Sequence, residues 1–133
     1  MNLIVVLDRQ NGMMFNHRRQ SRDRVLTERI LQISGGKLIV SPYTARLFEG
    51  LPAELTIAES PAAVAAMGQW CFVEDGSQNF AIEAIERLVV FRWDRVYPAD
   101  VTFPIDVSRL KLQSQTDFAG SSHEKITQEE YRP

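Results

Sequence analysis

The sequence predicts an α/β fold with three layers, in which helices cover both faces of a mixed sheet of about six or seven strands. Short apolar runs alternate with segments of helical spacing through most of the chain, which is typical of a mainly parallel sheet with helical crossovers. The C-terminal part instead contains two strand-like runs in succession. These runs predict an antiparallel hairpin that extends the sheet.

The first elements are read from apolar spacing and turn residues. LIVVL, residues 3–7, is a continuous apolar run of mostly β-branched residues, which indicates a buried strand, and Asn11-Gly12 marks the turn after it. The next apolar residues have helical spacing. They predict a helix that has Ser21 as its N-cap and Asp23 in its first turn, and that ends at Gly35-Gly36.

The alternation then continues along the chain. KLIV, residues 37–40, is predicted as a second strand directly after the helix. The order strand, helix, strand predicts a parallel pair with a right-handed crossover. Further strands are predicted at LTIA (55–58), QWCFVED (69–75) and LVVFRWD (88–94), and helical spacing occurs at PYTARLFEGL (42–51), PAAVAAM (61–67) and FAIEAIE (80–86). The hairpin strands are LKLQSQTDF (110–118) and HEKITQEEY (123–131), joined by AGSS.

Composition sets the broad class of protein. A chain of 133 residues with 44% hydrophobic content fits one domain, residues 1–133, that buries a core without disulfides. The net charge of −2 gives no overall attraction to nucleic acid or acidic membranes. Cys71 is the single cysteine, and we expect a buried thiol in a reducing compartment. No run approaches the ~20 apolar residues of a membrane span, so we expect a cytoplasmic protein without membrane or nucleic-acid partners.

A basic cluster precedes the first predicted helix. His17, Arg18, Arg19, Arg22 and Arg24 fall within eight positions, with Asp23 among them. Arginines beside a helix N-terminus can form an anion site, although a solvated basic loop explains them equally simply. Asp23 has three possible roles, namely a helix-start residue, a salt-bridge partner and an acid placed for chemistry. The two histidines lie in polar stretches, where we expect them at the surface, and no metal-ligand cluster occurs.

The order of these segments resembles the dihydrofolate reductase family over most of the chain. LIVVLDRQNG is similar to the family's opening strand and the start of its mobile loop, and SRDRVLTERIL is similar to the helix that carries its active-site acid, at Asp23. KLIVSPYT places Thr44 on the threonine of a Gly-Arg-x-Thr motif. LVVFRWDRVYPADVTFPID is similar to the family's strand and Asp-x-x-Phe-Pro segment, with Asp100, Phe103 and Pro104 in register, and the final EEYR is similar to its C-terminal strands.

Several positions depart from the family pattern. Its Gly-Arg, which clamps the NADPH phosphates, corresponds to Ser41-Pro42, and its Gly-Gly turn corresponds to Glu74-Asp75-Gly76. Proline offers neither a charge nor an N–H, and carboxylates repel a pyrophosphate. The strand and loop that hold the adenosine end and the loop's Leu-Pro-Trp have no counterpart here, and a pterin-binding threonine corresponds to Phe91. We therefore do not expect an efficient NADPH reductase.

The resemblance implies a small-ligand-binding or regulatory protein, for a pterin-like or nucleotide-like ligand and without a nicotinamide cofactor. A cleft between the first strand and the Asp23 helix would be lined by Val5, Leu7, Asp23, Thr44, Val73 and Phe91, and an anionic tail of the ligand would meet Arg18, Arg19 and Arg22.

Two other hypotheses remain. The first is an NADPH-dependent pteridine (dihydrofolate) reductase with a rebuilt cofactor site, in which Asp23 is the catalytic proton donor and Ser41, Thr44 and Gly76 contact the cofactor. The second is an interaction module that uses the basic loop, for which the overall acidity disfavours nucleic acid. A homodimer could cover an edge of the sheet.

Overall fold

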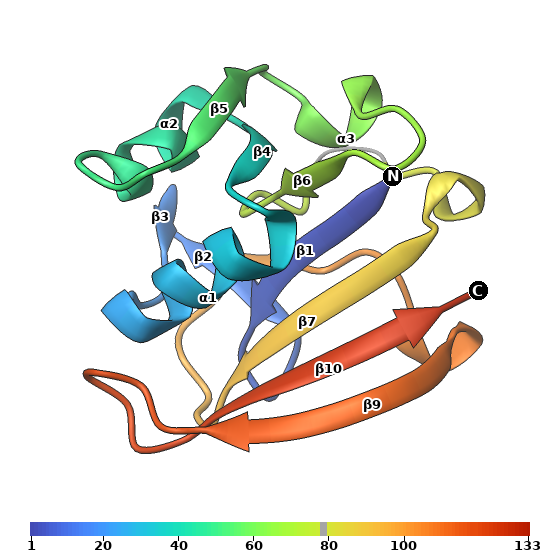
Figure 1. Cartoon of the computed structure of the whole chain (residues 1–133). Helices are drawn as coiled ribbons and strands as arrows, with labels where there is room; N and C mark the ends of the chain where they lie inside the picture. The colour runs from blue at the N-terminus through green and yellow to red at the C-terminus, as the bar shows by residue number, and fades with distance from the viewer. Residues whose placement is uncertain (78–79) are drawn as a thin grey trace.

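The computed structural model, which describes residues 1–77 and 80–133, contains a main sheet of seven strands in the order β5-β4-β6-β1-β7-β10-β9 (Figure 1). The first five of these strands are parallel, and β10 and β9 form an antiparallel hairpin beside β7. The strands are β1 (Asn2–Leu7), β4 (Lys37–Val40), β5 (Glu54–Ile57), β6 (Trp70–Phe72), β7 (Arg87–Trp93), β9 (Lys111–Phe118) and β10 (Ile126–Arg132). The predicted mixed sheet with a C-terminal hairpin is confirmed.

One predicted pairing is wrong. The strand at residues 37–40 is parallel to β1, as expected, but β6 lies between the two. Cys71 on β6 is in register with Leu3 on one side and with Ile39 on the other. The thiol is fully buried there, and burial raises its pKa to about 12. Proximity in the sequence suggested that the strand at residues 37–40 pairs with β1. Instead β6, which comes later in the chain, lies between these two strands.

The side chains of the central strands divide between two hydrophobic cores. On β1, Leu3, Val5 and Leu7 face one core, while Ile4 faces the other. On β7, Leu88 and Val90 alternate in the same way with Val89, Phe91 and Trp93. Both faces of these strands are therefore covered, which explains why their sequences are continuous apolar runs rather than alternating ones.

Helices cover both faces of the sheet, which confirms the predicted layers. The helix α1 (Arg24–Ser34) packs on the core that contains Phe91, and α3 (Pro61–Val64) packs on the opposite core. The other helical segments are short: α2 (Pro42–Ala45), η1 (Arg46–Phe48), η2 (Ile82–Ala84) and η3 (Val107–Arg109). Residues 80–86 have helical spacing in the sequence, but within them only η2 is helical, a single turn of 3₁₀ helix.

The helix α1 begins two residues later than the predicted N-cap implies. Asp23, not Ser21, is the N-cap, and its carboxylate accepts hydrogen bonds from the N–H groups of Val25 and Leu26. Gly35 ends the helix in the left-handed conformation with φ of 65°, as predicted. Ser21 lies outside the helix because its hydroxyl contacts His123 instead.

A small antiparallel sheet includes part of the segment that was predicted to be a basic loop. Its strands are β3 (Arg18–Arg19), β2 (Gly12–Phe15) and β8 (Val101–Thr102), in that order. Asn16 and His17 connect β2 to β3 with φ values of 52° and 60°, the geometry of a two-residue hairpin turn. The arginines of this segment are therefore held on a hydrogen-bonded hairpin.

None of the helices in residues 1–77 and 80–133 combines the length and the apolar character that a membrane span needs. The strands β5 and β9 form the two edges of the main sheet. A homodimer through one of these edges stays a prediction.

We expect Phe91→Ala to lower the free energy of unfolding by about 3–5 kcal/mol, because it removes a large side chain from a closed core. Phe91 is fully buried, and its ring meets Phe118 edge-on with 6.1 Å between centroids. Urea unfolding followed by circular dichroism measures the loss. Leu112→Ala, at a side chain that is 51% exposed on β9, is the control and should cost less than about 1 kcal/mol. Equal losses for the two variants would contradict the assignment of the core.

Candidate functional site

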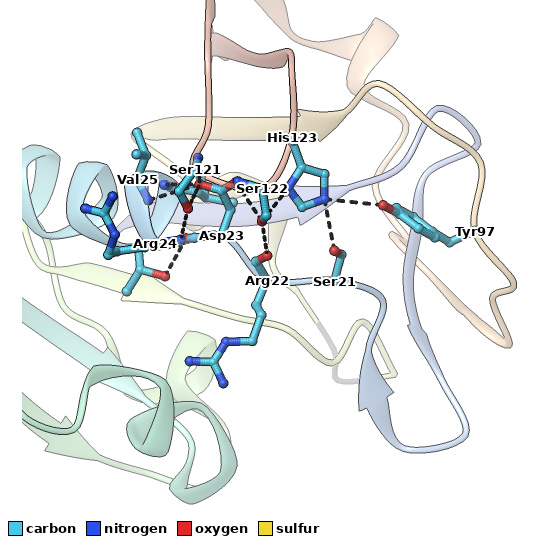
Figure 2. A network of polar contacts seen from close by, with 11 residues as sticks. Ser21, Arg22, Asp23, Arg24, Val25, Tyr97, Ser121, Ser122 and His123 are labelled. Atoms are coloured by element: carbon cyan, nitrogen blue, oxygen red, sulfur yellow. Dashed lines mark hydrogen bonds and ion pairs between the residues drawn. The ribbon is translucent and has the colours of Figure 1, made fainter.

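The carboxylate of Asp23 is enclosed by its own chain (Figure 2). Its Oδ1 accepts hydrogen bonds from the backbone N–H groups of Val25 at 3.0 Å and Leu26 at 3.2 Å, which satisfies two donors at the start of α1. The same oxygen accepts from the N–H of Ser121 at 3.0 Å, and Oδ2 accepts from the N–H of Ser122 at 2.8 Å. Both oxygens are thus used by backbone donors from two distant segments.

The loop at residues 119–125 reaches Asp23 through a glycine. A Cβ added to Gly120 would lie 2.7 Å from Cγ and 2.9 Å from Oδ1 of Asp23, closer than real Cβ contacts allow. Only glycine lets the backbone of this loop approach the carboxylate so closely. The AGSS segment, predicted as a plain hairpin connection, is therefore a cap over the N-terminus of α1.

These contacts determine the protonation state of Asp23. Burial by itself would raise the pKa of this carboxyl group, but hydrogen bonds from Ser122, His123 and Ser121 outweigh burial and hold the pKa well below its ordinary value of 3.8. Asp23 is consequently an anion at neutral pH. A proton donor for catalysis needs a pKa near the working pH, and Asp23 has the opposite shift.

His123 connects this carboxylate to two hydroxyl groups. Its Nδ1 lies 3.0 Å from Oδ2 of Asp23, and its Nε2 lies 3.0 Å from Oγ of Ser21 and 3.3 Å from the hydroxyl of Tyr97. Its ring stacks on Trp93 with 4.3 Å between centroids. The side chain is only 10% exposed, so the expected surface position of His123 is wrong, whereas His17 is exposed as expected.

The cleft predicted beside Asp23 is nearly closed. The cavity there has a volume of about 20 Å³, room for roughly one water molecule. Side chains of Arg19, Leu26 and Trp93 line it together with Asp23. Pockets that hold drug-sized ligands have volumes of about 300–1,000 Å³, so a pterin-like ring does not fit this cavity between β1 and α1 as it stands. A separate cavity of about 360 Å³ also borders Asp23, and its lining includes Arg22, Thr27 and Ser122.

The other residues predicted to line that cleft do not gather around Asp23. Val5, Leu7 and Val73 belong to the core on the opposite face of the sheet, and Phe91 is fully buried beneath α1. Thr44 lines a different cavity. The structure brings none of these side chains to the carboxylate of Asp23, because neighbouring residues of a strand point to opposite faces. Their role in ligand binding stays a prediction.

A larger cavity lies at the carboxyl ends of β4 and β6. Its volume is about 570 Å³, and its lining includes Tyr43, Thr44, Val73 and Asp75. The described residues that line it include three carboxylates, Glu59, Glu74 and Asp75, and one histidine, His17, but neither lysine nor arginine. Open α/β sheets bind ligands at this end of their strands.

An ion pair borders both cavities, since Glu74 lines each of them and Arg19 lines the smaller one. Arg19 on β3 binds Glu74 through two hydrogen bonds, Nε to Oε2 at 2.7 Å and Nη2 to Oε1 at 2.9 Å. Thr44 donates to the same Oε1 at 2.7 Å, and the guanidinium of Arg19 lies 4.5 Å from the centre of the Tyr43 ring. The pair is largely buried, with side-chain exposures of 19% for Arg19 and 8% for Glu74. It joins the β2–β3 hairpin to the segment that follows β6 in the main sheet.

The predicted anion and cofactor residues are dispersed by this arrangement. Arg18 and Arg22 are exposed, whereas Arg19 is paired with Glu74, so the three do not converge on one anion. Ser41 is the N-cap of α2 and lines the larger cavity with Thr44. Gly76 is buried, and a Cβ there would lie 2.6 Å from Met13 Sδ and from the Thr102 carbonyl oxygen. Its close packing is therefore with the protein's own β2 and β8 segments.

Within residues 1–77 and 80–133, no three His, Cys, Asp or Glu side chains are grouped as a metal ion would require. Sequence reasoning also missed the partnership of Ser21, His123 and Asp23. Ser21 and His123 are 102 positions apart in the sequence. The one local signal in this loop was the glycine that precedes two serines and a histidine at residues 120–123.

Comparisons with known proteins support the fold. No protein-family model and no curated protein sequence matches the chain. A solved structure of dihydrofolate reductase from Enterococcus faecalis, complexed with NADP(H) and RAB-propyl, is similar with a TM-score of 0.68. The alignment covers 98% of this chain and 94% of that chain at 14% sequence identity. The chain therefore has a dihydrofolate reductase-like fold.

We expect Gly120→Ala to lower the free energy of unfolding by about 1–3 kcal/mol, because its methyl group would overlap the Asp23 carboxylate. Chemical denaturation of four proteins in a double-mutant cycle with Asp23→Ser tests the cause. Serine is shorter and still caps a helix, so the double variant should lose at least about 0.5 kcal/mol less than the sum of the single losses. Strictly additive losses would show that the methyl group collides with something else.

We also expect the stability of the protein to fall below about pH 4 through Asp23. The pKa of Asp23 is lower in the folded than in the unfolded state, so its contribution is complete above the unfolded pKa near 3.8 and declines as pH falls further. Free energies of unfolding at pH 7, 5, 4, 3 and 2 should decline less steeply in Asp23→Asn. Part of the pH dependence should remain in this variant, because the pKa of Asp8 is also lowered in the folded protein. Gln115→Ala, at an exposed and uncharged side chain on β9, is the control, and an unchanged slope in Asp23→Asn would contradict the assignment.

Proposed function

We propose that this protein binds a small molecule in the 570 Å³ cavity at the carboxyl ends of β4 and β6. The carrying observation is that this cavity has the size of a ligand site and lies where open α/β sheets bind ligands, whereas the cavity between β1 and α1 has room for roughly one water. The similar dihydrofolate reductase structure is complexed with NADP(H) and RAB-propyl, which supports small-molecule binding on this fold. The protein would act as a binding or regulatory protein.

The charges of the lining favour a neutral or cationic ligand. Glu59, Glu74 and Asp75 supply three carboxylates, and Glu74 is paired with Arg19. The described lining contains one histidine, His17, but neither lysine nor arginine. A pyrophosphate there would lie beside the carboxylate of Asp75, and like charges at short range repel by kcal-scale energies. A planar ring that bears an amine or amidine could donate hydrogen bonds to Asp75 and lie near Tyr43. This chemistry favours a pterin-like over a nucleotide-like ligand.

The alternative, an NADPH-dependent pteridine reductase with a rebuilt cofactor site, has less support. It requires a proton from Asp23, whose pKa is lowered, and a substrate in the cleft between β1 and α1, where the cavity is about 20 Å³. It also requires basic groups near Ser41 and Thr44, whose shared cavity has an acidic lining.

Isothermal titration calorimetry with 2,4-diaminopyrimidine, 6-methylpterin and NADPH tests the proposal. We expect 2,4-diaminopyrimidine to bind and NADPH to give no heat at millimolar concentration. Asp75→Asn should weaken diaminopyrimidine binding at least about tenfold, since one lost charge-assisted hydrogen bond is worth about 1.5–3 kcal/mol. Glu54→Gln, an exposed carboxylate on β5 outside this cavity, is the matched control.

Two results would reject the proposed function. If neither 2,4-diaminopyrimidine nor 6-methylpterin binds at millimolar concentration, the proposed pterin-like class of ligand is rejected. Binding of NADPH in preference to either ring, with oxidation in the presence of dihydrofolate, would instead support the reductase alternative.

A further inference from the structure

We propose that Ser21, His123 and Asp23 form a nucleophilic triad that hydrolyses small acyl esters. Oγ of Ser21 lies 3.0 Å from Nε2 of His123, and Nδ1 of the same ring lies 3.0 Å from Oδ2 of Asp23. Figure 2 shows the imidazole of His123 between the hydroxyl of Ser21 and the carboxylate of Asp23. Such triads are recognised by geometry rather than by the order of residues in a sequence. This site is separate from the ligand cavity of the proposed function.

The hydrogen-bond chemistry fixes the direction of proton transfer. Asp23 is ionised and can only accept, so Nδ1 of His123 carries the proton and donates to Oδ2. In the neutral ring Nε2 is then an acceptor, and the hydroxyl of Ser21 donates to it. This is the tautomer in which histidine serves as the general base for a serine nucleophile.

The surroundings hold the imidazole in this orientation. Trp93 stacks on the ring at 4.3 Å, and the backbone N–H groups of Ser121 and Ser122 fix the Asp23 carboxylate. Asp23 has a side-chain exposure of 0% and His123 of 10%. A carboxylate that is buried, backbone-bonded and aimed at Nδ1 is a positioning residue, because it stabilises the imidazolium without contacting substrate.

The space beside Ser21 determines the class of substrate. Ser21 is half-buried and lines the 20 Å³ cavity, which admits a group the size of a methyl but not a long acyl chain. The hydroxyl of Tyr97, 3.3 Å from Nε2, is a donor available to the oxygen of the reacting carbonyl. Asp8 positions this region, since its Oδ2 accepts from the N–H of Tyr97 at 3.1 Å and from Nε2 of Gln20 at 2.9 Å. The geometry favours acetyl-sized esters.

The reaction is balanced by water alone. Oγ of Ser21 attacks the acyl carbon while its proton passes to Nε2 of His123, and the tetrahedral intermediate expels the alkoxide, which takes that proton. A solvent water then gives a proton to Nε2 and attacks the acyl group on Ser21. Breakage of the acyl–oxygen bond releases the carboxylic acid, and the proton on Nε2 of His123 returns to Oγ of Ser21, which restores the serine and the neutral imidazole.

A fluorophosphonate probe tests the nucleophile without knowledge of the natural substrate. We expect one covalent adduct on the full chain at neutral pH, located at Ser21 by peptide mass mapping. Ser21→Ala should abolish it, and Ser114→Ala, an exposed serine on β9, should leave the labelling rate unchanged. His123→Gln and Asp23→Asn should each slow labelling by about 100-fold or more, with thermal melts in parallel to show that both variants fold.

Ester hydrolysis provides the second readout. Turnover of p-nitrophenyl acetate should exceed that of p-nitrophenyl octanoate at least about tenfold, because a long chain exceeds the cavity. Absence of an adduct, an adduct at another residue, or unchanged labelling in folded His123→Gln would overturn the triad. The network would then serve only to join the loop to α1. Faster hydrolysis of the octanoate would overturn the assignment of substrate class.

Discussion

The carboxylate of Asp23 is the interaction on which the rest of this region depends. A buried charge is tolerated only when hydrogen bonds replace the water it has lost. Here the donors come from the start of α1 and from the loop between β9 and β10, so one side chain joins segments about 100 positions apart. Gly120 permits that approach, and His123 extends it to Ser21 and Tyr97. The helix, the hairpin and the chain around Tyr97 therefore share one anchor.

A second charged contact borders two of the cavities. Arg19 and Glu74 form a bidentate pair, to which Thr44 also donates. Glu74 lines both the cavity of about 20 Å³ between β1 and α1 and the larger cavity. The described lining of the larger cavity contains three carboxylates and one histidine but neither lysine nor arginine. A dihydrofolate reductase-like framework is thus combined with a ligand-sized cavity rich in carboxylates. The two proposals concern different cavities, and each has its own readout.

Local patterns determined much of the fold. The apolar runs of β1 and β7 predicted strands covered on both faces, and the helical spacing before Gly35-Gly36 predicted α1. The C-terminal runs predicted the hairpin. Local patterns failed to predict the length of one helical segment and the pairing of one strand. Residues 80–86 have helical spacing but form a single 3₁₀ turn, and the strand at 37–40 is separated from β1 by β6. A strand's neighbour is selected by the whole sheet, which a local window does not contain.

The sequence by itself determined the fold class, the order of the main-sheet strands along the chain and the position of Asp23 at the start of a helix, because these depend on the spacing of apolar and turn residues. Only the tertiary structure decided what Asp23 contacts, which faces Val5 and Leu7 occupy, and that Arg19 is paired rather than available to an anion. The reason is physical. Burial, cavity volume and the pKa of a carboxyl group depend on atoms brought together from distant positions, and hydrogen bonds such as the one between Ser21 and His123 leave no periodic trace in the chain.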